Sequence, residues 1–257
     1  MKIGFIGMGN MASAIAGGII DSKFIDGKDV YAYDIDNEKL NDMNKRFNLN
    51  PTSSLNELVK KVDLIVFAVK PNVIEAVVEE IVDDINDKII VSIVNGYDFY
   101  KYEELLNEGT KHVTIMPNTP ALVKQGMTLV EKENTLDESQ LEYVINMLNS
   151  IGEVQVLPGY QFKAGSALSG CGPAYVYMMI EALADGAVLE GLPRDVAYKL
   201  ASQTVIGSGM MQKKTNIHPG VLKDNVCSPG GITIKGVETL EEANFRNAVI
   251  KAVKASK

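Results

Sequence analysis

The sequence predicts an α/β fold in which an N-terminal, doubly wound parallel sheet is followed by an all-helical region. Three observations predict this fold. Short apolar strands alternate with helical patterns up to about residue 157, a glycine-rich turn joins the first strand to the first helix, and no strand pattern follows Pro158. We therefore expect two domains, residues 1–158 and residues 159–257.

The predicted strands are short and rich in β-branched residues, and they cover residues 2–6, 29–33, 63–69, 88–94 and 112–116. The unbroken apolar run at 63–69 is typical of a strand that is covered on both faces. Helical patterns at 12–20, 37–47 and 73–81 separate the first four strands, and Asn50-Pro51 breaks the second helical pattern. Strands linked in this way form right-handed crossovers and a parallel sheet.

The C-terminal region carries apolar residues at helical spacing in three stretches, 173–191, 193–214 and 233–254. Alanine and glycine lie on several of these apolar faces, which suits close contact between helices. A small helical domain with so much apolar surface often completes its core with a second subunit, so we expect a homo-oligomer.

Composition excludes several classes of function. The 257 residues include 25 basic and 33 acidic side chains, a net charge of −8, which disfavours nucleic acid and anionic membranes as partners. Two cysteines cannot form a disulfide framework, and they predict a reducing, cytoplasmic location. The apolar start, residues 1–20, has some features of a signal peptide, but glycines and Asn10 interrupt it, and no stretch reaches the length of a membrane span.

The glycine-rich turn is Gly7-Met-Gly9-Asn-Met-Ala12, which follows a predicted strand and opens a predicted helix. Gly7 permits the tight turn, Gly9 lets the backbone approach a pyrophosphate, and Ala12 lets the helix pack on the strand. The helix N-terminus offers N–H groups and a positive dipole end to the phosphates. The motif in this context predicts a Rossmann-type dinucleotide site, which also disfavours the signal-peptide interpretation.

Asp34 ends the second predicted strand, 27 residues after Gly7, where an acidic residue meets the adenosine ribose in such sites. A carboxylate there accepts hydrogen bonds from the ribose hydroxyls and repels a 2′-phosphate, which favours NAD. The alternative is that Asp34 caps the helix that follows.

Three further segments follow strand ends and so lie on the same edge of the sheet as the glycine turn: residues 68–71, 94–96 and 116–120. Lys70 is the one cation among them. It is either a cofactor contact or a solvated lysine at a strand end.

Five sequence blocks together resemble the pyrroline-5-carboxylate reductases. They are GFIGMGNMA (4–12), AVKP (68–71), MPNTP (116–120), LSGCGPAY (168–175) and HPGVLKDNVCSPGGITI (218–234). The resemblance implies a Rossmann domain, a helical dimerisation domain and NAD(P)H-dependent reduction of 1-pyrroline-5-carboxylate to L-proline in proline biosynthesis. It also implies homodimers, which in many members assemble into decamers.

The resemblance also assigns residues. Those it gives to the cofactor, beside Asp34, are Ile6, Gly7, Met8, Gly9, Asn10, Met11, Ala68, Val69, Lys70, Pro71, Asn95 and Asn225. Those it gives to the substrate are Ser228, Gly230, Gly231, Ile232 and Thr233. Backbone N–H groups after the Gly230-Gly231 pair suit the substrate carboxylate, and the Thr233 hydroxyl would lie by the imine nitrogen as the catalytic group. A loop with a helix cap is the structural alternative for this segment.

The sequence departs from the family pattern at three places. Asp34 stands where many relatives carry a small polar residue, so the choice between NADH and NADPH stays open. Val94-Asn95 replaces Ala-Ala, and Ile232 replaces Thr or Ala. Cys171, Cys227, His112 and His218 have no partners at nucleophile or metal-ligand spacing, and we expect no metal.

Two other functions are alternatives to the reductase. A 3-hydroxyacid dehydrogenase needs a catalytic lysine in its second domain, and residues 164–180 contain none. A nucleotide-sensing regulator would bind the cofactor and would not oxidise it.

Overall fold

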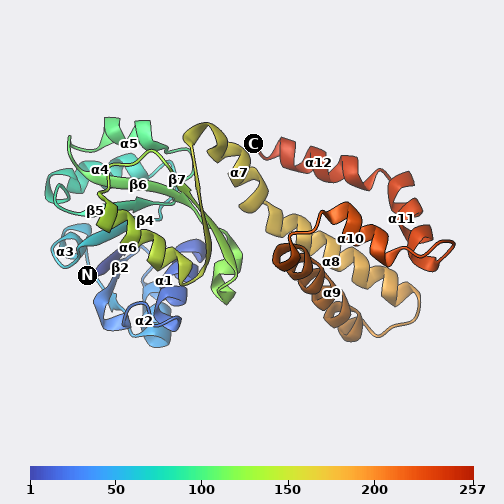
Figure 1. The fold of residues 1–257 in the computed structure, drawn as a ribbon. Coiled ribbons are helices and arrows are strands. Elements are labelled where there is room, and N and C mark those ends of the chain that lie inside the picture. Colours follow the sequence, from blue (N-terminus) through green and yellow to red (C-terminus); the bar gives the residue numbers. More distant parts are fainter. The chain divides into compact units, whose positions relative to one another are not determined.

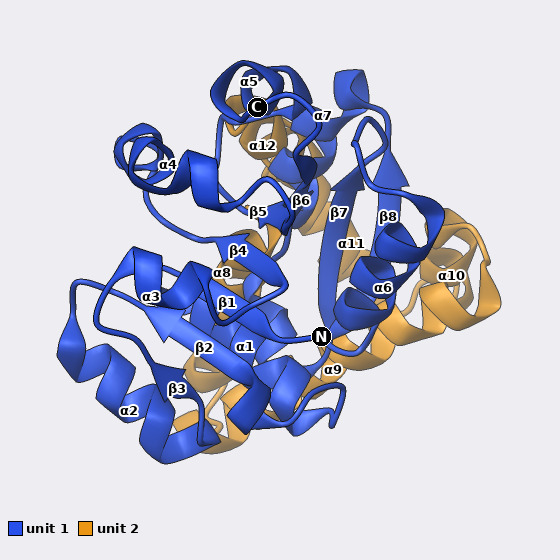
Figure 2. Cartoon of the chain, turned by 90° about the vertical axis from the view of Figure 1, so that its left-hand side faces the viewer, with its two compact units in different colours: residues 1–170 blue, residues 171–257 orange.

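The computed structural model describes residues 1–257, and the chain divides into two compact units, Met1–Gly170 and Cys171–Lys257 (Figures 1 and 2). The predicted domain boundary lies twelve residues earlier, after residue 158. Between the two positions lies α7 (Gly159–Ser169), which packs on the last two strands of the first unit.

The first unit contains one eight-stranded sheet of order β3-β2-β1-β4-β5-β6-β7-β8. The strands are β1 (Ile3–Ile6), β2 (Val30–Tyr33), β3 (Asn50–Pro51), β4 (Leu64–Phe67), β5 (Ile89–Ser92), β6 (Lys111–Met116), β7 (Gly126–Glu131) and β8 (Gly152–Leu157). The order 3-2-1-4-5-6 of the first six strands is that of a Rossmann fold, which confirms the predicted class. From β1 the chain first adds β2 and β3 on one side and then returns to add β4 on the other side. The strand order therefore reverses at β1, and the glycine turn begins at the end of this strand.

The five predicted strands, β1, β2, β4, β5 and β6, are all parallel to one another, as predicted. Two of the strands that were not predicted, β7 and β8, run in the opposite direction. All neighbouring pairs are parallel except β6 and β7, which pair antiparallel through Ile115↔Val130 and Met116↔Leu129. The reason is the short connection between them. Only a 3₁₀ turn, η3 (Thr119–Val123), follows β6, and it is too short for the helical crossover that a parallel neighbour requires. The Asn50-Pro51 pair, expected only to break a helix, is the edge strand β3.

Helices cover both faces of the sheet, as a doubly wound fold requires (Figure 1). One apolar core lies between the sheet and α1 (Asn10–Asp21), α2 (Asn37–Phe47) and α6 (Glu138–Asn149). The other lies beneath α3 (Leu55–Val59), α4 (Ile74–Ile81) and α5 (Phe99–Leu105). Ile3, Phe5 and Ile65 are fully buried, and each such side chain contributes about 1.5–3 kcal/mol. Burial on both faces explains why these strands read as unbroken apolar runs.

The second unit is all-helical, as predicted. Its helices are α8 (Gly172–Leu189), α9 (Arg194–Thr215), α10 (Pro219–Val226), α11 (Ile232–Glu242) and α12 (Phe245–Ala255). Its buried apolar cluster consists of only Ala184, Ala197 and Ala201, where α8 and α9 cross. Small side chains allow that close crossing, and they leave most larger apolar side chains of the unit exposed.

None of the helices combines the length and the apolar character that crossing a lipid bilayer requires. Both cysteines are free thiols. The apolar start of the chain, which had some features of a signal peptide, forms β1 and the buried face of α1.

Candidate cofactor site

The glycine turn connects β1 to α1 at the carboxyl edge of the sheet. Gly7 has a φ of +93°, which non-glycine residues rarely adopt, and its N–H donates to the Tyr33 carbonyl at 2.8 Å. A Cβ on Gly7 would lie 2.6 Å from the Ala68 carbonyl oxygen. The turn therefore needs glycine at this position because the chain must pass between the ends of β2 and β4.

Gly9 is the N-cap of α1, and no side chain caps the helix. A Cβ built on Gly9 would meet no atom within 4 Å. The first N–H groups of α1 have no carbonyl partners within the helix, so they remain available to an anion. Ala12, in the third glycine position, is buried where α1 packs on the sheet. The turn thus has the free space and the donors that a pyrophosphate needs.

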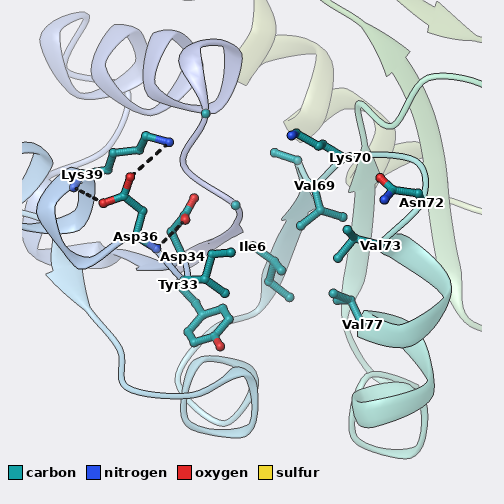
Figure 3. Close-up of a pocket in the computed structure, with 14 residues that line it drawn as sticks. Ile6, Tyr33, Asp34, Asp36, Lys39, Val69, Lys70, Asn72, Val73 and Val77 are labelled. Atoms are coloured by element: carbon teal, nitrogen blue, oxygen red, sulfur yellow. Dashed lines mark hydrogen bonds and ion pairs between the residues drawn. The ribbon is translucent and has the colours of Figure 1, made fainter.

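A cavity of about 510 Å³ opens beside this turn, and the ends of β1, β2 and β4 form its walls (Figure 3). Its volume is within the range of small-molecule and cofactor sites. The lining residues are Ile6, Gly7, Gly9, Tyr33, Asp34, Ile35, Asp36, Lys39, Ala68, Val69, Lys70, Asn72, Val73 and Val77. The apolar side chains on the β4–α4 side face the polar end of β2 across the cavity (Figure 3).

Asp34 holds the glycine turn to the end of β2. One of its carboxylate oxygens accepts the Met8 N–H at 2.5 Å, and the other accepts the Asp36 N–H at 2.9 Å. Each oxygen keeps a lone pair that can still accept a ribose hydroxyl. The alternative that Asp34 caps the next helix is wrong, because Asp36 is the N-cap of α2 and accepts the N–H groups of Glu38 and Lys39.

Lys39 is the only cation on the β2 side of the cavity, and its ammonium group lies 3.4 Å from the Asp36 carboxylate (Figure 3). Backbone N–H donors and the lysine keep the pKa of Asp36 below its usual value, first through the hydrogen bond from Lys39 N. Any 2′-phosphate here would face two carboxylates and a lysine that is already paired.

Seven of the predicted cofactor residues line the cavity: Ile6, Gly7, Gly9, Asp34, Ala68, Val69 and Lys70. Five others lie outside the lining but in the same unit: Met8, Asn10, Met11, Pro71 and Asn95. Of these, Met8 is buried and acts through its backbone N–H, and Asn95 is exposed in the turn after β5. As ligand contacts, all of them stay predictions.

Asn225 and the predicted substrate residues lie in the second unit. Asn225 is exposed on α10, and Ser228, Gly230 and Gly231 form the turn before α11. Gly231 N–H donates to the Ser228 carbonyl at 3.0 Å, and Gly230 has a φ of +68°, as a type II turn requires. Ile232 and Thr233 are exposed in the first turn of α11. No side chain caps that helix, so its N–H groups are also available to an anion.

Seven lining residues are not predicted by any sequence motif: Tyr33, Ile35, Asp36, Lys39, Asn72, Val73 and Val77. They lie at the end of β2, in the segments that follow β2 and β4, or in the first turns of α2 and α4. Their position in the strand order could have indicated them, but they belong to no motif.

The fold and this cavity define a Rossmann-type oxidoreductase that uses NAD(P). Over 253 residues the chain is 42% identical to the pyrroline-5-carboxylate reductase of Escherichia coli (strain K12), covering 98% of this chain and 94% of the relative. The chain belongs to the pyrroline-5-carboxylate reductase family. The predicted family is thereby confirmed, and with it the reductase activity and the NAD(P) cofactor.

Further comparisons agree. The pyrroline-5-carboxylate reductase of Arabidopsis thaliana is 39% identical over 261 residues, covering 100% of this chain and 94% of the relative. The crystal structure of Plasmodium falciparum pyrroline carboxylate reductase, which has NADP bound, superimposes with a TM-score of 0.91 at 37% identity, covering 100% of this chain and 95% of that one. Residues 2–96 match the family of coenzyme F420-dependent NADP oxidoreductases. Residues 160–257 match the pyrroline-5-carboxylate reductase dimerisation domain, which indicates a homo-oligomer.

Proposed function

We propose that this chain reduces 1-pyrroline-5-carboxylate to L-proline, the last step of proline biosynthesis, with NAD(P)H bound in the cavity beside the glycine turn. The observation that carries the cofactor assignment is the open space at Gly9, in front of the uncapped N-terminus of α1. A pyrophosphate would receive N–H donors there without displacing any protein atom. NAD(P)H bound in this way supplies the hydride.

The substrate is a cyclic imine that carries a carboxylate, so its site needs an anion clamp and a hydrogen-bonding group near the ring nitrogen. The turn at Gly230-Gly231 and the uncapped start of α11 supply backbone N–H groups for the carboxylate without any arginine. Ser228 and Ile232 would flank this clamp.

We assign the ring nitrogen to Thr233, whose hydroxyl is exposed and makes no hydrogen bond within the chain. Reduction breaks the C=N π bond, adds the hydride to carbon and leaves the nitrogen to take a proton. The Thr233 hydroxyl would orient that nitrogen and help deliver the proton from solvent.

A spectrophotometric assay with 1-pyrroline-5-carboxylate, run in parallel with NADH and NADPH, tests this function. Cofactor oxidation that depends on the substrate is the expected result. Binding of cofactor without oxidation would instead indicate a nucleotide sensor. No oxidation of either cofactor would overturn the proposal.

We further propose that the enzyme prefers NADH. Asp34 and Asp36 both line the adenosine side of the cavity, and Lys39 is already paired with Asp36. Two carboxylates would repel the 2′-phosphate of NADPH, whereas Asp34 can accept the ribose hydroxyls of NADH.

Asp34→Ser is expected to shift the ratio of kcat/KM values toward NADPH by about tenfold, which corresponds to about 1.4 kcal/mol. Asp34 also accepts the Met8 N–H and so holds the glycine turn in place. Asp34→Ser should therefore weaken the binding of both cofactors in addition to changing their ratio. Steady-state kinetics with both cofactors measure the shift. Asp137→Ser is the matched control, because it makes the same change at the N-cap of α6, and serine is itself a good N-cap. An unchanged ratio in Asp34→Ser would remove Asp34 from cofactor choice.

We propose that residues 159–257 act as the dimerisation and substrate domain, beside a cofactor domain of residues 1–158. Large apolar side chains of α8 and α9 are exposed, among them Met178, Leu200 and Ile206 at 68%, 53% and 59%. Such a surface needs a second copy to cover it. Light scattering after size exclusion is expected to give twice the mass of the chain, or ten times if dimers assemble further. A stable monomer would contradict the proposal.

We also propose a cytoplasmic location, because both thiols are free and a reducing compartment keeps them so. Fractionation of the producing cells tests it.

A further inference from the structure

The turn after β5, residues 94–97, is held in place by side chains from four different elements. This segment is here called the rim turn. It carries Asn95, and it lies beside the end of β4, since the Ile93 N–H donates to the Phe67 carbonyl at 3.0 Å. Asn95 and Gly96 are exposed, and Gly96 has a φ of +83°.

Three contacts fix the distal part of the rim turn. The Lys101 ammonium group donates to the Gly96 carbonyl at 2.6 Å, and the Thr114 hydroxyl donates to the Tyr97 carbonyl at 3.3 Å. The Tyr97 hydroxyl donates to the Glu75 carboxylate on α4 at 2.7 Å. All three contacts involve Gly96 or Tyr97, which follow Asn95, so other groups hold the start of the turn.

The start of the rim turn is fixed from the interior. The Val94 N–H donates to the Ser92 hydroxyl oxygen at 3.1 Å, and that oxygen lies 2.5 Å from the Tyr102 hydroxyl. Ser92 and Tyr102 are both buried, at 1% and 0% exposure, so water cannot replace either bond. A buried hydroxyl pair of this kind is strongly favoured over its broken state.

The buried ring of Tyr102 packs among three other aromatic rings. The ring lies between Phe67, Tyr97 and His112, with ring centroids 6.4, 5.8 and 5.9 Å away. Burial raises the pKa of Tyr102, so its hydroxyl keeps its proton, and either hydroxyl of the Ser92–Tyr102 pair can be the donor. The packed ring therefore holds the Tyr102 hydroxyl in place on α5, and the Ser92 hydroxyl is held through its hydrogen bond to it.

The location of the rim turn says which part of the cofactor it would meet. In the proposed site the pyrophosphate would lie at the turn after β1 and the adenosine half at the end of β2, so the nicotinamide half would extend over β4 and β5. The rim turn follows β5 and is therefore on the nicotinamide side.

We infer that Tyr102 is a positioning residue for the nicotinamide half of the cofactor: through Ser92 it fixes the backbone of Val94 and thereby the placement of Asn95. This inference rests on the proposed cofactor site. Tyr102 does not itself touch the cofactor. Its loss should weaken only those contacts that the rim turn makes.

The experiment compares two probes, NADH and ADP-ribose, which lacks the nicotinamide. Tyr102→Phe, which keeps the ring, is expected to raise the dissociation constant for NADH about five- to tenfold, the effect of one buried hydrogen bond, and to leave that for ADP-ribose unchanged. Ser92→Ala should have the same effect, and the double variant should be no worse than either single one because both act through one chain of bonds. Fluorescence titration measures NADH binding, and calorimetry measures ADP-ribose binding.

Tyr143→Phe is the matched control. It removes the hydroxyl of a half-buried tyrosine on α6, whose ring packs against Phe24, and should leave both dissociation constants unchanged. Wild-type affinity for NADH in both Tyr102→Phe and Ser92→Ala would overturn the inference, and so would an equal loss of NADH and ADP-ribose, which would indicate general damage. If the unchanged protein binds neither probe, the proposed cofactor site itself is wrong. That outcome differs from one in which the unchanged protein binds both probes and only this inference fails.

Discussion

Gly9→Ala is expected to raise the dissociation constant for NAD(P)H at least about tenfold, or about 1.4 kcal/mol, in a protein that folds normally. The added methyl group would meet no protein atom within 4 Å, so the fold has room for it. Gly9 has a φ of −66° and a ψ of 178°, which alanine also adopts. The methyl group would instead occupy the space in front of α1 that a pyrophosphate needs. Fluorescence titration with NADH measures the loss of binding.

Thermal unfolding provides the control for this prediction. The stability of Gly9→Ala should stay within about 1 kcal/mol of the unchanged protein, because only a weak cap preference and a gain in backbone rigidity are involved. Gly7→Ala should behave differently and lose about 1–3 kcal/mol of stability, because its φ is +93° and its Cβ would lie 2.6 Å from the Ala68 oxygen. If Gly9→Ala binds NADH as tightly as the unchanged protein, the pyrophosphate does not lie against Gly9.

Of the five predicted strands, β1, β4 and β5 could be found from the sequence because their burial on both faces produces nearly unbroken apolar runs. β2 and β6 are rich in β-branched and aromatic residues, which also favours strands. The antiparallel direction of β7 could not be found from the sequence. Gly126 to Glu131 has the composition of any strand, and its direction depends on the length of the connection through η3. The compact unit also extends past Pro158, because Gly165 lets α7 approach Leu157 and Leu129 at the end of the sheet. Such packing depends on contacts between distant segments, which periodicity does not report.

The site was predictable where a motif fixes the backbone. Gly7 is predictable because the turn requires a residue without a side chain, and Gly9 is predictable because the motif keeps the space in front of the helix free for a pyrophosphate. The role of Asp34 in holding the Met8 N–H was not found, because the hydrogen bond joins residues 26 positions apart. Ser92 and Tyr102 also could not be predicted as a pair. In the sequence each is an ordinary core residue, and only the fold brings their hydroxyl groups together.

Thr233 is the proposed catalytic group, and its place on α11 explains why alanine should affect turnover and not folding. The residue is exposed in the first turn of the helix, and its hydroxyl makes no bond that stabilises the chain. Replacing it therefore removes only what the hydroxyl does for the substrate. An oriented hydrogen bond or proton delivery in the transition state contributes about ten- to hundredfold or more to the rate.

Thr233→Ala is accordingly expected to lower kcat by about ten- to hundredfold while the dissociation constant for NAD(P)H stays unchanged. Thr233→Ser keeps the hydroxyl and should recover most of the rate. Thr239→Ala makes the same change on the same helix, at a hydroxyl that donates to the Lys235 carbonyl at 3.1 Å, and should leave kcat unaltered. Single-turnover measurements with NAD(P)H already bound would separate the chemical step from substrate binding. Unchanged kcat in Thr233→Ala would remove Thr233 from the reaction, whereas a loss of cofactor affinity would mean that the hydroxyl contacts NAD(P)H and not the imine.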